Sequence, residues 1–214
     1  MSLRIPDPPV LPDAAIQRLL EGNRRFLHHE HDPLPRRFNP DLVNGQRPFA
    51  TVLGCSDSRV PAELVFDQGL GDLFVIRVAG NIVAPSLIGS AEFAVSRFGT
   101  ALLVVMGHTN CGAIAAAVHA VEQDDSPSKN LRAITDRIKP HIVDLVREAG
   151  SDAHVEGTEA RHTLLRKALR ANVRNSVAQL QHGSAMLEEL VGTGQVRIVG
   201  AEYELESGKV ELVE

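Results

Sequence analysis

Two short stretches of the sequence carry side chains that could do chemistry. In "CSDSRVPAE", Cys55 is followed two residues later by Asp57 and four residues later by Arg59. In "HTNCGA", His108 stands three residues before Cys111. These are the two cysteines of a 214-residue chain. Thiol, carboxylate, guanidinium and imidazole groups at such spacing are the parts from which nucleophilic, redox and metal sites are built.

A metal site would use all of these groups. Two thiolates and one imidazole suit Zn²⁺, so Cys55, His108 and Cys111 could be three ligands of one ion. Asp57 could fill the fourth position and close the site, or water could fill it and make the site catalytic. Arg59 could hold the Asp57 carboxylate in a bidentate pair, away from the metal. Water on zinc is acidified from a pKa of ~15.7 toward ~7, so hydroxide would be available near neutral pH.

Each of these residues also has an ordinary structural explanation. A cysteine at a strand end is often a small buried hydrophobic residue, and a histidine is often a hydrogen-bonded core residue. Asp57 and Arg59 could be a turn acceptor and a surface ion pair. The two motifs at consecutive strand ends are a stronger signal than either motif alone. A thioredoxin-like redox site needs a Cys-x-x-Cys motif, which neither cysteine belongs to, and a Cys–His nucleophilic dyad leaves Cys111 unexplained.

The two motifs follow short apolar runs that predict buried strands. Runs rich in Val, Ile and Leu occupy 49–55, 73–79 and 101–108. Such runs are typical of parallel strands that helices cover on both faces. The first run ends at Cys55 and the third at His108. Because ligands of such sheets bind beyond the carboxyl ends of the strands, both motifs lie at the same edge if the two strands are parallel neighbours.

Helical patterns alternate with these strands. Asp13 can cap a helix that runs to about His28, and the Pro-rich stretch before it is expected to lie as an arm on the body of the protein or on a neighbouring subunit. Further helices are expected over 85–98, from 112 to 122, from about 130 to 150 after a loop at 123–130, from 158 to 183, and after 184. A fourth buried strand is expected over 195–205, followed by a hairpin partner over 206–213.

This alternation predicts an α/β fold. We expect a central, mostly parallel β-sheet flanked by helices, with an antiparallel C-terminal edge strand and an N-terminal helical arm. The length is that of one domain overall. Within it we assign 1–48 to the N-terminal arm and helix, and 49–214 to a zinc-binding α/β catalytic domain.

Composition narrows the class of protein. The net charge of -5 argues weakly against nucleic acid as a partner. No stretch reaches the ~18 uncharged apolar residues expected of a membrane span, so no membrane partner is expected. The N-terminus lacks the apolar core of a secretory signal. Two cysteines offer no disulfide framework, and a cytoplasmic, reducing location is therefore expected.

Three motifs together resemble the β-class carbonic anhydrases in residue type and spacing. They are "CSDSRVPAE" at 55–63, "GDLFVIRVAGN" at 71–81 and "GHTNCGA" at 107–113, and the closing "GAEYELESGKVELV" is similar to that family's final strands. The resemblance implies reversible hydration of CO2 to bicarbonate and a proton. It also implies Zn²⁺ on Cys55, His108 and Cys111, with Asp57 and Arg59 as the catalytic pair.

One branch of that family keeps the metal site open, and another can close it with the aspartate. The open branch has a glutamine nine residues before the first cysteine and a phenylalanine nineteen residues after it, where this chain has Gln46 and Phe74. A tyrosine of the family is replaced by Phe93, which removes a hydroxyl from the pocket wall. The resemblance thus implies Gln46, Phe74, Phe93 and the Gly112 amide as substrate-binding groups. Gly80 is expected to loosen a loop near the site.

The resemblance also implies an oligomer. The family is dimeric or built of dimers, so a homodimer or homotetramer is expected. Its N-terminal helices embrace the partner subunit, a role that fits residues 1–48. Gln46, Phe74 and Phe93 could then face a cleft shared by two chains.

Three other functions stay open at this point. The scaffold can resemble hydrolases of COS or CS2, which use the same zinc chemistry, and pocket access rather than ligand identity would decide between them. A second is a regulatory or binding protein whose site is permanently closed by Asp57, against which Gln46 and the Asp57–Arg59 pair argue. A third is a purely structural zinc site, which usually has four protein ligands rich in cysteine.

Overall fold

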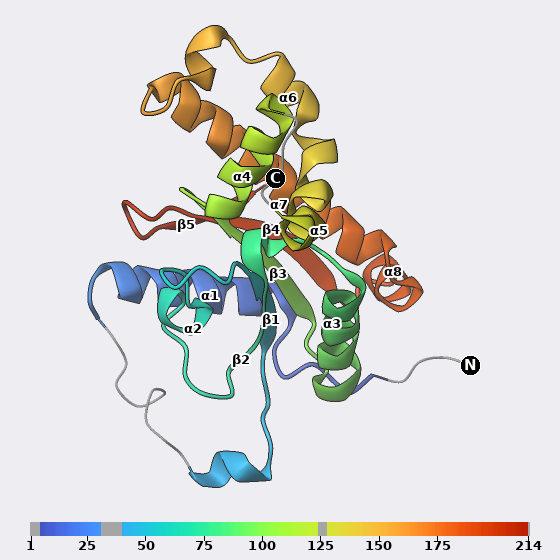
Figure 1. Ribbon diagram of the computed structural model, residues 1–214. Helices are drawn as coiled ribbons and strands as arrows, with labels where there is room; N and C mark the ends of the chain where they lie inside the picture. The colour runs from blue at the N-terminus through green and yellow to red at the C-terminus, as the bar shows by residue number, and fades with distance from the viewer. Residues whose placement is uncertain (1–4, 31–39, 124–127, 214) are drawn as a thin grey trace.

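A five-stranded sheet forms the centre of the computed structural model, which describes residues 5–30, 40–123 and 128–213 (Figure 1). Four strands run parallel: β1 (Ala50–Gly54), β2 (Leu73–Arg77), β3 (Leu102–His108) and β4 (Arg197–Tyr203). The fifth, β5 (Val210–Val213), pairs antiparallel with β4. The order across the sheet is β2-β1-β3-β4-β5. The predicted fold class is therefore confirmed.

The pairing of β1 with β3 places the two sequence motifs at one edge of the sheet. Gly54, the last residue of β1, is opposite Met106 of β3. Cys55 therefore leaves the sheet close to His108, the last residue of β3. Because the two strands are parallel, the segments that follow them both leave the sheet at its carboxyl end.

Helical segments cover both faces of the sheet (Figure 1). They are α1 (Pro12–Leu27), η1 (Pro40–Asn44), α2 (Ala62–Val65), η2 (Ala79–Asn81), α3 (Pro85–Phe98), α4 (Gly112–Glu122), α5 (Lys129–Ile138), η3 (Lys139–His141), α6 (Val143–Arg147), η4 (Ser151–His154), α7 (Glu159–His182) and α8 (Ala185–Gly192). None of the helices within the described ranges combines the length and apolar composition needed to cross a bilayer.

The side chains of the buried strands alternate between two cores, as the period of a strand requires. Leu53 and Val105 belong to the core beneath α3, α4, α7 and α8. Val52 and Val104 belong to the core beneath α1 and α2. The approach of α7 is especially close, because a Cβ added at Gly107 would lie 2.5 Å from the Leu169 side chain. The double burial explains why these strands read as continuous apolar runs.

Two details of the expected helices differ in the structure. Asp13 does not cap α1: Leu11 is the N-cap residue, and Asp13 lies in the first turn, where it pairs with Arg197. Pro12 begins the helix one residue earlier because its fixed φ suits the first helical position. The single helix expected from about 130 to 150 is also wrong. It is divided into α5, η3 and α6, since Pro140 has no N–H for the helical ladder.

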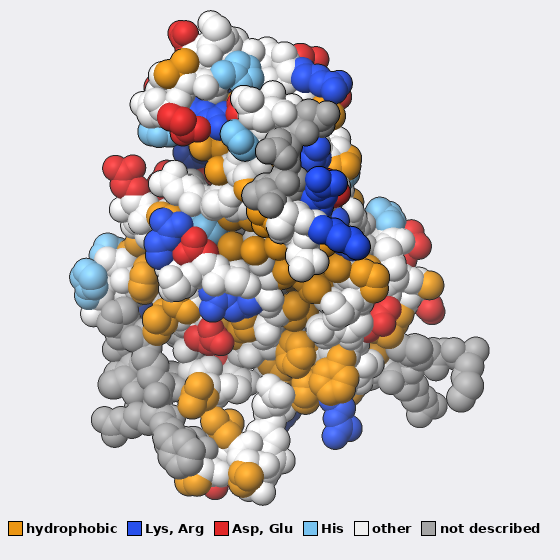
Figure 2. Space-filling view, in the orientation of Figure 1, with side chains coloured by type: hydrophobic (Ala, Val, Ile, Leu, Met, Phe, Trp, Pro, Cys, Tyr) orange, Lys and Arg blue, Asp and Glu red, His pale blue; other side chains and the backbone are white. Residues whose placement is uncertain are grey.

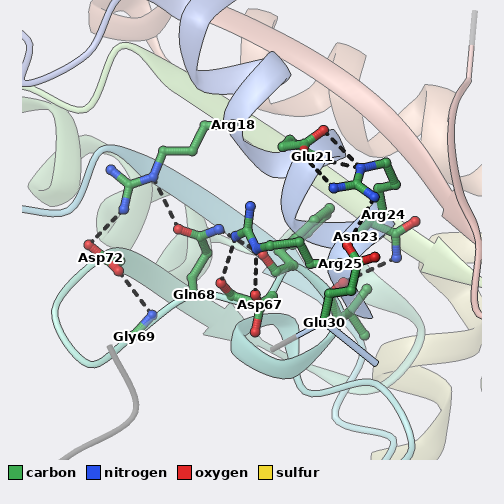
Figure 3. A network of polar contacts seen from close by, with 12 residues as sticks. Arg18, Glu21, Asn23, Arg24, Arg25, Glu30, Asp67, Gln68, Gly69 and Asp72 are labelled. Carbon is green, nitrogen blue, oxygen red and sulfur yellow. Dashed lines mark hydrogen bonds and ion pairs between the residues drawn. The ribbon is translucent and has the colours of Figure 1, made fainter. Parts of the chain in front are cut away.

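The N-terminal helix packs against the sheet of its own chain. Its apolar face buries Ala15, Ile16 and Leu19 in the core beneath α1 and α2. Polar contacts fasten the other side to the loop between α2 and β2, as Figure 3 shows: Arg18 binds Asp72 at 3.0 Å and Arg25 binds Asp67 at 2.7 Å. Contact between 1–48 and a partner subunit stays a prediction. Residues 1–4 and 31–39 of that segment, and 124–127 of the expected loop at 123–130, lie outside the described residues.

Asn23 provides a test of how α1 is held. This buried amide donates to the Val65 carbonyl at 3.1 Å and the Gly208 carbonyl at 2.9 Å, and it accepts from the Val210 N–H at 2.9 Å. We expect Asn23→Ala to lower the free energy of unfolding by about 2–4 kcal/mol, because two buried backbone groups and one partly buried group lose their partner. Urea denaturation measures this change.

The neighbouring residue supplies the control. Arg24 lies on the exposed side of the same helix and pairs with Glu21 and Glu30. Arg24→Ala should leave stability nearly unchanged, since exposed ion pairs contribute little. Equal effects of the two substitutions would show that Asn23 does not anchor the helix.

Candidate metal centre

Cys55, His108 and Cys111 converge in the structure, as the sequence predicts. Each offers one ligand atom, and these atoms all lie within 4.8 Å of one another. The two sulfur atoms are 4.0 Å apart, and all three residues are buried. They come from the residue after β1, the last residue of β3 and the N-cap of α4. A set of two sulfurs and one imidazole nitrogen is the donor chemistry of zinc sites.

The turn between β3 and α4 brings Cys111 back toward His108. Asn110 has a positive φ of 54°, a conformation that asparagine tolerates better than most residues. The Thr109 N–H donates to the Tyr203 carbonyl at 3.0 Å, which ties the turn to β4. The Thr109 hydroxyl accepts from the Leu205 N–H at 2.9 Å. The three residues from His108 to Asn110 thus reverse direction on a fixed support.

The two ring nitrogens of His108 have different surroundings. Its Nδ1 faces the Thr109 carbonyl at 2.9 Å. A proton on Nδ1 satisfies that carbonyl and leaves the lone pair on Nε2. The Nε2 atom is buried and has no hydrogen-bond partner among the described residues. Metal-binding histidines commonly donate one ring N–H to a backbone carbonyl, and this bond orients the other nitrogen toward the metal.

The two thiols have opposite pKa shifts, and each is the largest cause of the other's shift. The Cys55 sulfur accepts from the N–H groups of Asp57 at 3.4 Å and Gly80 at 3.3 Å. The Cys111 thiol, followed by His108 and these two amides, lowers the pKa of Cys55 to about 4. The resulting thiolate raises the pKa of Cys111, together with burial. A divalent cation at this point would favour ionisation of both thiols.

Arg59 binds Asp57 in the bidentate manner expected from the sequence. The Arg59 Nε lies 2.9 Å from Oδ1 and Nη2 lies 2.7 Å from Oδ2, and the Arg59 N–H adds a third bond to Oδ1. These bonds hold the pKa of the Asp57 carboxyl well below its ordinary value of 3.8. The ion pair therefore contributes its full stabilisation at pH values above the pKa of a free aspartate. This contribution is lost as the pH falls through the lowered pKa of Asp57. The Asp57 Oδ2 is 3.9 Å from the His108 Nε2.

An aromatic cluster covers the side of the sheet next to β2. Phe74 on β2 and Phe93 on α3 have ring centroids 6.1 Å apart, and Phe98 lies 5.9 Å from Phe74 and 5.7 Å from Phe93. Phe93 is 51% exposed, and Figure 2 shows hydrophobic side chains gathered over α3. Gly112, the first residue of α4, is exposed, with open space where a Cβ would point.

Gln46 is not brought to the cluster within one chain. It is exposed and follows η1, before β1 begins. Figure 1 shows η1 beyond the amino end of β1, at the opposite end of the sheet from α4. The five residues of β1 span roughly 16 Å between these two ends. The direction of the strand therefore separates Gln46 from Cys55.

Sequence reasoning missed or misread three neighbours of the cluster. Arg77 donates to the carbonyls of Cys55 and Asp57, and Asn172 of α7 donates to the Gly80 carbonyl at 2.8 Å. The expectation that Gly80 loosens its loop is wrong, because Gly80 is buried and bonded on both sides. Its φ of 71° lies in the left-handed region that favours glycine.

Comparison with known proteins gives one consistent family. The family model described as carbonic anhydrase matches residues 50–210. A carbonic anhydrase of Mycolicibacterium smegmatis is 41% identical over 205 residues, which are 94% of this chain and 93% of that protein. Carbonic anhydrase 2 of Mycobacterium tuberculosis is 37% identical over 203 residues, covering 94% of this chain and 92% of that protein.

Solved structures share the fold. The β-carbonic anhydrase CcaA has a TM-score of 0.67 at 26% identity, over 92% of this chain and 87% of that chain. A structure from a study of two tetrameric β-carbonic anhydrases of the ascomycete Sordaria macrospora has a TM-score of 0.70 at 22% identity, over 93% of this chain and 96% of that chain. The arrangement of sheet and helices is therefore that of these proteins.

Gly80 can be tested against a second glycine. A Cβ at Gly80 would lie 2.9 Å from the Ala113 Cβ, and the positive φ adds strain. We expect Gly80→Ala to lower the free energy of unfolding by roughly 1–3 kcal/mol. Gly89 lies in α3 with no atom within 4 Å of an added Cβ, so Gly89→Ala should raise it by about 0.5–1 kcal/mol. Thermal and urea unfolding measure both, and a neutral Gly80→Ala would contradict the close packing.

Proposed function

The chain belongs to the β-class of carbonic anhydrases, and on that premise we propose that it catalyses the reversible hydration of CO2 to bicarbonate and a proton. Zn²⁺ is the proposed cofactor, with Cys55, His108 and Cys111 as its ligands. The observation that carries the proposal is the buried, unpartnered Nε2 of His108 beside two sulfur atoms, all within 4.8 Å. When bound, zinc supplies a Lewis acid that makes water a nucleophile near neutral pH.

The proposed role of Asp57 is to accept and orient a proton of the attacking water. A carboxylate that stays charged near neutral pH can accept this hydrogen bond without competing protonation. Arg59 occupies both carboxylate oxygens and so limits the directions in which Asp57 can turn. The same bonds argue against a site that Asp57 closes permanently.

The substrate side of the site is proposed to be apolar with one amide donor. Phe74 and Phe93 offer ring surface to CO2, which has no charge to pair with. The Gly112 N–H belongs to the first turn of α4, where amides have no partner within the helix. It could donate to the oxygen that gains charge during hydration.

We further propose that a second copy of the chain completes the site. β2 is an edge strand, and the exposed Phe93 lies on the helix beside it. A twofold axis at this edge would place the amino end of the partner's sheet next to the carboxyl end of this one. Gln46, remote from its own cluster, would then reach the partner's. Sedimentation of the purified protein tests this, and a monomer at assay concentrations would contradict it.

We also propose that the protein is located in the cytoplasm. Cys55 and Cys111 are free thiols in the structure, and a reducing compartment keeps thiols available for metal. Fractionation of cells that produce the protein, followed by detection in each fraction, measures the location.

The central experiment is stopped-flow CO2 hydration from about pH 6 to 9, with zinc measured in the same sample. We expect one zinc ion per chain and a rate that rises with pH. Parallel assays on COS and CS2 separate the alternative, since the ligand set suits all three substrates. Background CO2 turnover with rapid COS or CS2 hydrolysis would overturn the proposal.

Removal of one ligand should release the metal. Cys111→Ser replaces a thiolate by a weak ligand, so we expect loss of zinc, loss of activity and a lower midpoint of thermal unfolding. Elemental analysis after dialysis gives the zinc content. His119→Ala, on the exposed face of the same helix, is the control and should keep both metal and rate. Full zinc occupancy in Cys111→Ser would show that the ligand set is wrong.

Removal of Arg59 should free Asp57. In Arg59→Ala the pKa of Asp57 should rise back toward 3.8, and the carboxylate should turn to the metal. We expect a fall in kcat of about 10–100-fold near neutral pH, the usual effect of removing an outer-shell partner. Arg59→Lys keeps the charge without the bidentate geometry, so its kcat should lie between those of the wild-type protein and Arg59→Ala. An Arg59→Ala protein with the wild-type rate would rule out this role of the pair.

A further inference from the structure

Arg77 lies beside the loop that carries Cys55 and Asp57. It is the last residue of β2, and its partner in the sheet is Gly54. The Arg77 Nε donates to the Cys55 carbonyl at 2.9 Å, and Nη2 donates to the Asp57 carbonyl at 2.6 Å. One guanidinium therefore binds the carbonyls of the two residues on either side of Ser56.

Backbone hydrogen bonds also join the segments that follow β1 and β2, but only as far as Ser56. The Val78 N–H donates to the Gly54 carbonyl at 3.1 Å, and the Ser56 N–H donates to the Val78 carbonyl at 3.3 Å. Beyond Ser56 the guanidinium of Arg77 continues the connection to Asp57. Hydrogen bonds from a charged donor are stronger than those between neutral groups. Arg77 is itself exposed, and of its two bonds the one to the Cys55 carbonyl is partly buried.

The position of Asp57 matters because its carboxylate lies close to the Cys55–His108–Cys111 cluster. Its Oδ2 is already 3.9 Å from the His108 Nε2. Arg59, which binds its carboxylate, has a side chain that is 52% exposed, with a further bond of 3.2 Å to the Asn110 carbonyl. The guanidinium of Arg59 binds the Asp57 carboxylate and not the Asp57 carbonyl, whereas that of Arg77 binds the carbonyl.

We infer that Arg77 is a positioning residue that fixes the main chain from Cys55 to Asp57. Arg77 holds the peptide groups while Arg59 holds the carboxylate, and together they keep Asp57 off the metal. The planar fork of arginine can reach two carbonyls at once, which the single ammonium of lysine does not reproduce. This inference rests on the proposed function, because it gives the Cys55–His108–Cys111 cluster a metal.

The test compares Arg77→Gln and Arg77→Lys with the wild-type protein. In the crystal structure of zinc-loaded Arg77→Gln we expect the Asp57 carboxylate on the metal and the bond to Arg59 broken. The kcat for CO2 hydration should fall about 10–100-fold, with a smaller loss in Arg77→Lys. Arg147→Gln, an exposed arginine on α6, is the matched control and should change neither the structure of the loop nor the rate.

The crystal structures of the Arg77 variants test the inference independently of the rate measurements. An Arg77→Gln structure with Asp57 still on Arg59 would overturn it, even if the rate fell. The metal-free variant should also show a displaced 55–57 loop and a broken Asp57–Arg59 pair. If the wild-type protein neither binds zinc nor hydrates CO2, the proposed function fails, while the loop in these variants still decides the role of Arg77. If Arg77→Gln does not fold, the same comparison is made with Arg77→Lys.

Discussion

The parallel pairing of β1 with β3 is the constraint on which the rest of the site depends. It aligns Gly54 with Met106, and so brings Cys55 and His108 out of the sheet at one edge. A shift of one residue in this register would turn every side chain of the shifted strand to the opposite core. The apolar cores on both faces therefore fix the positions of Cys55 and His108 as firmly as they stabilise the fold.

The surroundings of the cluster favour negative charge before any metal is considered. Two backbone N–H groups point at the Cys55 sulfur, and two arginines bind the loop that follows it. These contacts stabilise a thiolate and a carboxylate close to each other, which would otherwise repel. The protein thus prepares an anionic site for a cation by distributing hydrogen-bond donors around its rim.

Much of the fold and most of the site could be predicted because they depend on local patterns. Buried strands read as apolar runs, and the triad follows from which runs end in Cys55 and His108. The break at Pro140 was harder to predict, because apolar residues at helical spacing continue past it. The start of α1 at Pro12 was also missed, because Asp13 is a residue type that often caps helices. The separation of Gln46 from the cluster depends on strand direction in three dimensions, and a glutamine beside a motif in sequence carries no such information.

The contacts of Arg77, Gly80 and Asn172 could not be predicted, for a different physical reason. Each joins a side chain to a backbone group on another element, and such bonds leave no periodic trace in the sequence. The bond from Asn172 to Gly80 spans 92 residues. Only the packing of α7 on the sheet brings these two residues together.

That long span has a consequence for how the protein is made. A chain emerging from the ribosome only as far as α4 already contains all three ligands, but it lacks Asn172 of α7 and Tyr203 of β4, which support Gly80 and Thr109. Domains generally fold as units once their sequence is available. The Cys55–His108–Cys111 cluster should therefore reach its final geometry only after the C-terminal third has been synthesised.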